Sequence, residues 1–283
     1  MITMGPFAFL SVLLSLPWNI GGVGTCGTAD IVGNSVANCD CPTRTSLTPS
    51  CGGKGMKCND PYCHVDTTGE LVECFEGCVQ GNIECDACYL YFHSLCLCMK
   101  KSSLNCIQSG DWWLLNDHKL ITTSKKVPGI LQLGSDNGGW EFGQSLLGAG
   151  TVASRQWGTL SVNSVLSRDE EQIHIHVCDN PSSALRTHLS TLNWYDFKDK
   201  PKPLLVPIAG NSRFPAGTVQ CQAALNPGTH MDVAEITSKY VNSLGGCERE
   251  KVGAGLITDK NDYSWVCLTT MDDHAAVQLF CYV

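Results

Sequence analysis

The chain has 283 residues, of which 43% are hydrophobic, and its formal net charge is −8. This length is enough for one large domain or two ordinary ones. An acidic balance argues against a non-specific nucleic-acid binder, because such a protein needs a basic excess to displace phosphate counterions. A local site for an anionic small molecule is compatible with this charge.

Residues 1–24 form an apolar run that is too short to span a bilayer comfortably. The small residues Gly22 and Gly24 precede Thr25 and resemble a signal-peptide cleavage point, although the run lacks the usual basic start. We therefore predict a signal peptide over residues 1–24 and a secreted protein. The alternatives are a retained membrane anchor and an internal apolar strand.

The 18 cysteines are distributed unevenly: thirteen lie between Cys26 and Cys106, and five lie in the rest of the chain. Behind a signal peptide, this density indicates disulfides in preference to zinc. Residues 25–109 are therefore predicted to form a small cysteine-rich domain that depends on disulfides for its stability. Because both numbers are odd, complete pairing would require at least one bridge between the two regions.

Residues 110–283 combine strand and helix patterns. A hairpin is predicted over residues 111–124, a helix within 138–157, and two strands over 158–166 and 172–177. Asn180 is predicted to cap a helix over 181–192, and a second helix begins near Thr229 and ends at Gly245. A hairpin over 253–271 and a strand over 275–283 follow. Together these elements predict an α+β domain.

The strand "QIHIHV" carries two histidines among aliphatic residues. Since alternate side chains of a strand face the same way, Gln172, His174 and His176 share one face, and the aliphatic residues between them face a core. Three interpretations are open: a hydrogen-bonded structural pair, a metal pair without a third ligand nearby in sequence, and nucleophilic catalysis at phosphorus. In the third, amides near Ser182 and Ser183 would receive a phosphate.

The segment "LSVNSVLSRDEEQIHIHVCDNPSSALRTHL" resembles the signature block of the CDP-diacylglycerol diphosphatase family, a branch of the histidine-triad (HIT) superfamily. Asn163 stands eleven residues before His174, as in that family. The hairpins near both ends of residues 110–283 are similar to the family's first and closing hairpins. The resemblance implies an HIT-like, mostly antiparallel sheet with flanking helices over these residues.

The resemblance also implies roles for individual residues. His174 takes the position of the nucleophilic histidine, and His176 that of the histidine that contacts the phosphate and the leaving group. Asn163 matches the asparagine that holds substrate oxygens. Gln172 replaces the first histidine of the triad, which is a departure from the pattern.

A second departure lies in the loop. Val165 stands where family members tend to carry an arginine, so Arg168 is the candidate substitute for substrate binding. Ser182 is the remaining candidate, through the amides at the start of the helix that follows the histidine strand.

These residues imply a secreted hydrolase that cleaves a nucleoside diphosphate diester of the CDP-diacylglycerol kind through a nucleotidyl-histidine intermediate. No cofactor is indicated, although a divalent metal held by His174 and His176 is a weaker alternative. The substrate would be a nucleotide-linked small molecule or a lipid at a membrane surface. The competing hypothesis is a secreted disulfide-rich binding protein whose HIT-like domain has lost activity, and Gln172 is its main support.

Overall fold

The computed structural model describes residues 106–115, 119–123, 125, 127, 129–164, 167, 173–271 and 274–283, together with Leu95 and Cys98. The predicted signal peptide and almost all of the predicted cysteine-rich domain lie outside the described residues. In the part of the chain that is described, no helix is both long and apolar enough to cross a membrane.

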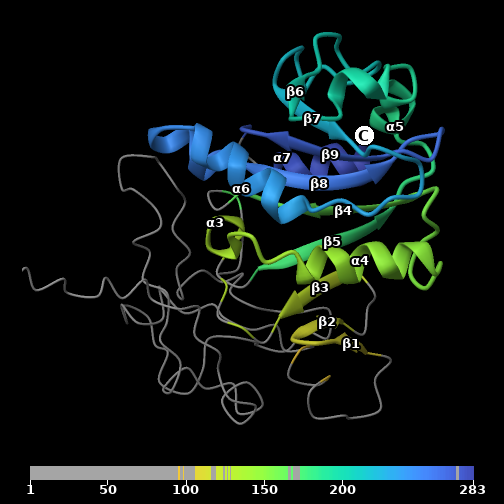
Figure 1. The fold of residues 1–283 in the computed structure, drawn as a ribbon, viewed down its shortest axis with the longest axis vertical. Helices are drawn as coiled ribbons and strands as arrows, with labels where there is room; N and C mark the ends of the chain where they lie inside the picture. The colour runs from red at the N-terminus through yellow and green to blue at the C-terminus, as the bar shows by residue number, and fades with distance from the viewer. Residues whose placement is uncertain are drawn as a thin grey trace, which may run out of the picture.

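The described residues form an α+β fold around a nine-stranded antiparallel sheet (Figure 1), which confirms the predicted class. The strand order is β1-β2-β3-β5-β4-β8-β9-β7-β6, so β4 and β5 lie side by side in the middle. The strands are β1 (Ile107–Ser109), β2 (Trp112–Leu114), β3 (Leu120–Thr123), β4 (Gly158–Val162), β5 (His174–Asp179), β6 (Lys202–Pro203), β7 (Val219–Ala223), β8 (Gly253–Thr258) and β9 (Ser264–Thr269).

Two hairpins predicted from the sequence are present. The aromatic and aliphatic residues of 112–123 form β2 and β3, which pair in antiparallel register. The glycine-rich segment and its tryptophan-containing partner form β8 and β9, and Asp262 in the turn between them has a positive φ of 65°. Because β1 also pairs with β2, the sheet begins at Ile107, slightly before the predicted boundary at residue 110.

One face of the sheet is covered by α4 (Gly138–Gly148) and α6 (Val233–Ser243), which lie in front of it in Figure 1. Both helices lie where the sequence predicts helices. The short helix α3 (Ile130–Leu133) belongs to the same layer. The core on this side contains Ile173, Ile175 and Val177, as the alternation of the histidine strand predicts.

The opposite face carries a second apolar cluster under α5 (Ala184–Leu189), α7 (Ala275–Val277) and the π-helical segment η6 (Gln278–Tyr282). Two 3₁₀ segments, η4 (Trp194–Phe197) and η5 (Gly246–Lys251), complete the fold. Gly255 makes room for this layer, because a Cβ there would lie 2.3 Å from a ring carbon of Phe280.

Two predictions about these elements are wrong. Residues 275–283 form α7 and η6 instead of a strand, because their apolar residues occupy one face of a helical turn above β8. The helix after β5 starts at Ala184, with Ser183 as its N-cap: the Ser183 hydroxyl accepts a hydrogen bond from the Arg186 amide at 3.1 Å. Asn180, the predicted cap, instead donates to the Val283 carbonyl at 3.0 Å.

Among the described residues, three disulfides confirm that the chain uses cysteine bridges: Cys98–Cys106, Cys178–Cys281 and Cys221–Cys267. The last two pair four of the five cysteines that follow Cys106. A bridge between the two predicted regions would therefore have to involve Cys247, whose side chain lies outside the described residues.

Candidate functional site

The polar face of β5 lies against the polar residues of β4. Their antiparallel register places His176 opposite Ser161 and Cys178 opposite Thr159. Asn163 follows β4 directly, and continuing the register by two residues places it opposite His174. On the other side of β5, Thr122 of β3 pairs with His174. We call His174, His176, Ser161 and Asn163 the histidine face.

The two histidines of β5 contact each other. Their ring centroids lie 4.9 Å apart with an interplanar angle of 75°, so one ring meets the other edge-on. Both residues are partly exposed, but the Nε2 atom of His176 is buried and has no hydrogen-bond partner. A structural pair with every nitrogen bonded to protein is therefore not what the structure shows. An orphaned buried nitrogen of this kind calls for an explanation.

His176 is held neutral. Burial lowers the pKa of His176 well below the ordinary value of 6.5, and positive charge on His174 or His274 would lower it further. At neutral pH the imidazole therefore carries one proton and one lone pair. A neutral imidazole can serve as a nucleophile, a base or a hydrogen-bond donor.

A third histidine, His274, contacts the histidine face and belongs to the segment 274–283. His274 directly precedes α7, and its Nδ1 atom lies 3.2 Å from Nδ2 of Asn163. The other side-chain atom of Asn163, Oδ1, accepts a hydrogen bond from the Val277 amide at 3.3 Å. Asn163 is almost fully buried. Sequence reasoning missed His274, because it lies one hundred residues after His174 and outside the motif.

The segment 274–283 covers the rest of the polar row on β4. Thr159 donates its hydroxyl to the Phe280 carbonyl at 3.2 Å, and Cys281 is bonded to Cys178, two residues beyond His176. The Ser161 hydroxyl lies 3.8 Å from the Cys281 sulfur. Position 274 is thereby anchored at one end by Asn163, and the far end of the segment is anchored by a disulfide.

Ser182, another predicted site residue, does not lie on the histidine face. Ser182 follows the far end of β5, which is about 17 Å long for its six residues. His174 begins β5, and the helix α5 follows the other end of that strand. The start of this helix therefore does not lie beside His174, as a phosphate site formed by its amides would require. Gln172 and Arg168 lie outside the described residues. Within the described ranges, no group of three or more metal-ligating side chains is arranged to hold a metal ion.

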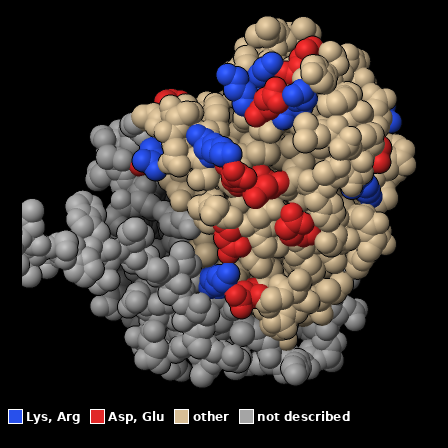
Figure 2. Space-filling view, viewed as in Figure 1, with Lys and Arg blue, Asp and Glu red and all other residues tan. Residues whose placement is uncertain are grey.

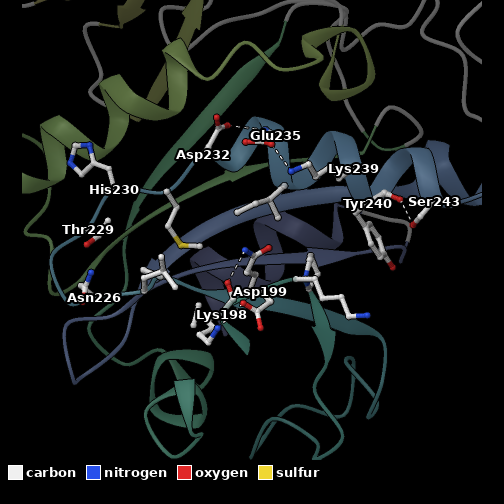
Figure 3. Close-up of a pocket in the computed structure, with 18 residues that line it drawn as sticks. Lys198, Asp199, Asn226, Thr229, His230, Asp232, Glu235, Lys239, Tyr240 and Ser243 are labelled. Carbon is white, nitrogen blue, oxygen red and sulfur yellow. Dashed lines mark hydrogen bonds and ion pairs between the residues drawn. The ribbon is translucent and has the colours of Figure 1, made fainter. Parts of the chain in front are cut away.

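A separate cavity of about 720 Å³ lies beside α6, on the side of the sheet that faces away from the histidine face. Figure 3 shows Lys239 and Tyr240 of α6 on one side of it and Lys198 and Asp199 on the other. Figure 2 shows that this side of the molecule carries charges of both signs. None of the residues of the histidine face lines this cavity, so it is distinct from the candidate site.

No protein-family model matches this chain. No curated protein is significantly similar to it. The resemblance to CDP-diacylglycerol diphosphatases thus depends on the residues of β4, β5 and the segments around them.

Proposed function

We propose that the chain is a secreted hydrolase that cleaves a nucleoside diphosphate diester of the CDP-diacylglycerol kind. The observation that supports this best is the gathering of His174, His176 and His274 with Asn163 on one face of the sheet. An HIT-like identity for the sheet belongs to the same proposal, and the adjacency of β4 and β5 is compatible with it. The disulfides favour secretion, since such bonds persist in oxidising compartments.

In the proposed reaction, a nitrogen lone pair of His174 attacks the nucleotide-side phosphorus. An N–P bond forms, and the bridging P–O bond breaks, so its electrons leave with the second phosphate group. Water then attacks the same phosphorus, the N–P bond breaks, and the imidazole regains its lone pair. One water proton passes to solvent or to the departing phosphate. The products are a nucleoside monophosphate and a phosphorylated alcohol.

The leaving group makes Gln172 compatible with turnover. A phosphate monoester has a second pKa of about 6, so it departs as an anion without first taking up a proton. A glutamine, which cannot carry that proton, is therefore tolerated at the first triad position. By the resemblance, His176 would donate to a phosphoryl oxygen. Because its Nε2 atom is buried, substrate binding would have to open access to it. A neutral donor aimed at developing charge stabilises the transition state.

The test is hydrolysis by the purified, oxidised full-length chain of a panel of nucleoside diphosphate diesters that vary in base and alcohol. Release of nucleoside monophosphate is measured for wild type, for His174→Ala, and for His230→Ala as matched control. His230 is a partly exposed histidine that contacts Glu141 on the opposite side of the sheet. We expect His174→Ala to lower kcat/KM at least about a hundredfold and His230→Ala to leave it unchanged.

The nucleophile is identified with a substrate that is labelled in its nucleotide part. The protein is denatured during turnover, and the histidine that carries the label is located. Label on His174 supports the proposed step, whereas label on His176 would reassign it. Wild-type protein that cleaves no member of the panel, with or without a divalent metal, would exclude the hydrolase and favour a secreted binding protein.

A further inference from the structure

The chain after β6 carries three consecutive apolar residues on the surface. Leu205 is 78% exposed, Val206 is 60% exposed, and Pro207 is exposed as well. We call these three residues the apolar tip. Single exposed apolar residues are normal on a protein surface, whereas a contiguous apolar patch marks contact with a protein or a membrane.

The apolar tip is held in place by buried residues on both sides. Leu204 precedes it and Ile208 follows it, and both are buried in the second apolar cluster. The Leu204 amide donates to the Val219 carbonyl at 2.9 Å, and the Leu204 carbonyl accepts from the Gly217 amide at 2.7 Å. The ring of Pro207 restricts the backbone further. A loop that is fixed in this way loses little conformational entropy when it binds another surface.

The segment around the apolar tip is basic, although the chain as a whole is acidic. Residues 200–231 contain no aspartate or glutamate, in a chain whose formal net charge is −8. Their formally cationic side chains are Lys200, Lys202 and Arg213. Asp199, which directly precedes this segment, is already paired with Lys198 at 2.7 Å. The local charge is therefore complementary to an anionic surface.

The place of the apolar tip in the fold suits contact with an extended surface. Figure 1 shows β6 and the chain around it at one end of the described fold, at the top of the view. Lys202 begins β6, and Leu205 follows two residues after its end. The basic and the apolar residues thus come from one short stretch at a projecting end of the described fold.

We propose that the apolar tip inserts into the surface of an anionic phospholipid bilayer, with Lys200 and Lys202 at the level of the lipid phosphates. A protein partner would be expected to cover a larger patch, since a standard interface involves about 20–30 residues a side. A bilayer, in contrast, accepts a small apolar wedge at the boundary of headgroups and acyl chains, and basic residues beside the wedge add to the attraction. This membrane contact goes beyond the proposed hydrolysis and does not depend on it.

The experiment measures binding of the oxidised full-length chain to sedimented vesicles, either of phosphatidylcholine alone or of phosphatidylcholine with phosphatidylserine. One variant combines Leu205→Ser with Val206→Ser, and a second combines Lys200→Gln with Lys202→Gln. The matched control is Leu225→Ser. Leu225 is also an exposed leucine, but it follows the end of β7 that is opposite to Val219 and the apolar tip.

We expect wild type to prefer the anionic vesicles and to lose affinity for them as the salt concentration rises. The double serine variant should bind them about ten- to a hundredfold more weakly, and the double glutamine variant about ten- to thirtyfold more weakly. Leu225→Ser should bind as wild type does. Vesicles should also slow hydrogen exchange at the amides of Leu205 and Val206. The melting temperatures of all variants should stay close to wild type, because the substituted side chains lie at the surface.

Several results would overturn the proposal. Wild type that binds no vesicles, or binds both kinds equally, would exclude an anionic membrane as the partner. Equal losses in the double serine variant and in Leu225→Ser would exclude the apolar tip as the contact. A wild-type dimer that the double serine substitution dissociates would assign the tip to a contact between two copies of the chain. Because vesicle binding needs no turnover, these results are independent of whether the protein cleaves a nucleotide diester.

Discussion

Replacing Gly255 by alanine is predicted to destabilise the layer that carries His274. A Cβ at this position would lie 2.3 Å from a ring carbon of Phe280 and 2.6 Å from the Leu160 carbonyl oxygen. Phe280 is 1% exposed, and the carbonyl oxygen belongs to the neighbouring strand β4. Neither atom can swing into solvent, so η6 must shift away from β8.

The size of the effect follows from the cost of overpacking a filled core, which is about 1–3 kcal/mol for an added methyl group without room. For a chain of this size we expect a melting temperature lower by about 2–12 °C. The assay is thermal unfolding of oxidised protein, followed by circular dichroism. Because η6 continues directly from α7 and α7 is bonded to Asn163, nucleotide-diester hydrolysis should slow as well.

The matched control is Gly148→Ala in α4, where a Cβ would meet no atom within 4 Å. This variant should equal wild type or gain up to about 1 kcal/mol, because alanine favours the helix and restricts the unfolded chain. A Gly255→Ala protein that melts at or above the wild-type temperature would refute the close packing of η6 on β8.

Three further outcomes are expected. Replacing Cys178 and Cys281 by alanine together should cost about 4–5 kcal/mol by loop entropy, since the bridge closes a loop with a sequence separation of 103; urea unfolding that matches wild type would contradict this. Below about pH 6.5 the unfolded chain protonates His176 while the native state does not, so stability should fall with decreasing pH by at most about 1.4 kcal/mol per unit. His188, whose pKa is also lowered by burial, adds the same sign, so the His176→Gln variant serves as reference, and parallel pH profiles would refute the assignment. Asn163→Leu should lower the free energy of unfolding by about 1–3 kcal/mol, because it leaves the Val277 amide without its acceptor. An unchanged melting temperature would argue against a stabilising hydrogen bond between Asn163 and Val277.

Local patterns in the sequence were sufficient for much of the sheet. The alternation of His174 and His176 with aliphatic residues predicted both the strand and the face that enters the core. The helical spacing of the apolar residues in 233–244 predicted α6, and Asp232 caps it by accepting from the Glu235 amide. In these elements, periodicity and capping agree with the packing.

The errors arise where a short apolar run fits two structures. Residues 275–283 alternate poorly and are too few to separate strand from helix by pattern alone. Their helical form depends on the space above Gly255, which belongs to a distant strand. His274 was missed for a related reason, since only the fold brings it to Asn163. Pairings of this range leave no periodic signal along the chain.

The bridge between Cys178 and Cys281 has a consequence for biosynthesis. The two cysteines are separated by 103 positions, which take about 5–20 s to translate at ordinary ribosome speeds. During that interval Cys178 lacks its native partner, while thirteen cysteines have already been made upstream. Mispaired bonds can form in that time, and without an isomerase their rearrangement takes minutes to hours. Maturation of the histidine face should therefore depend on disulfide isomerisation, because the segment that anchors His274 is joined to β5 only after the 103 positions between Cys178 and Cys281 have been synthesised.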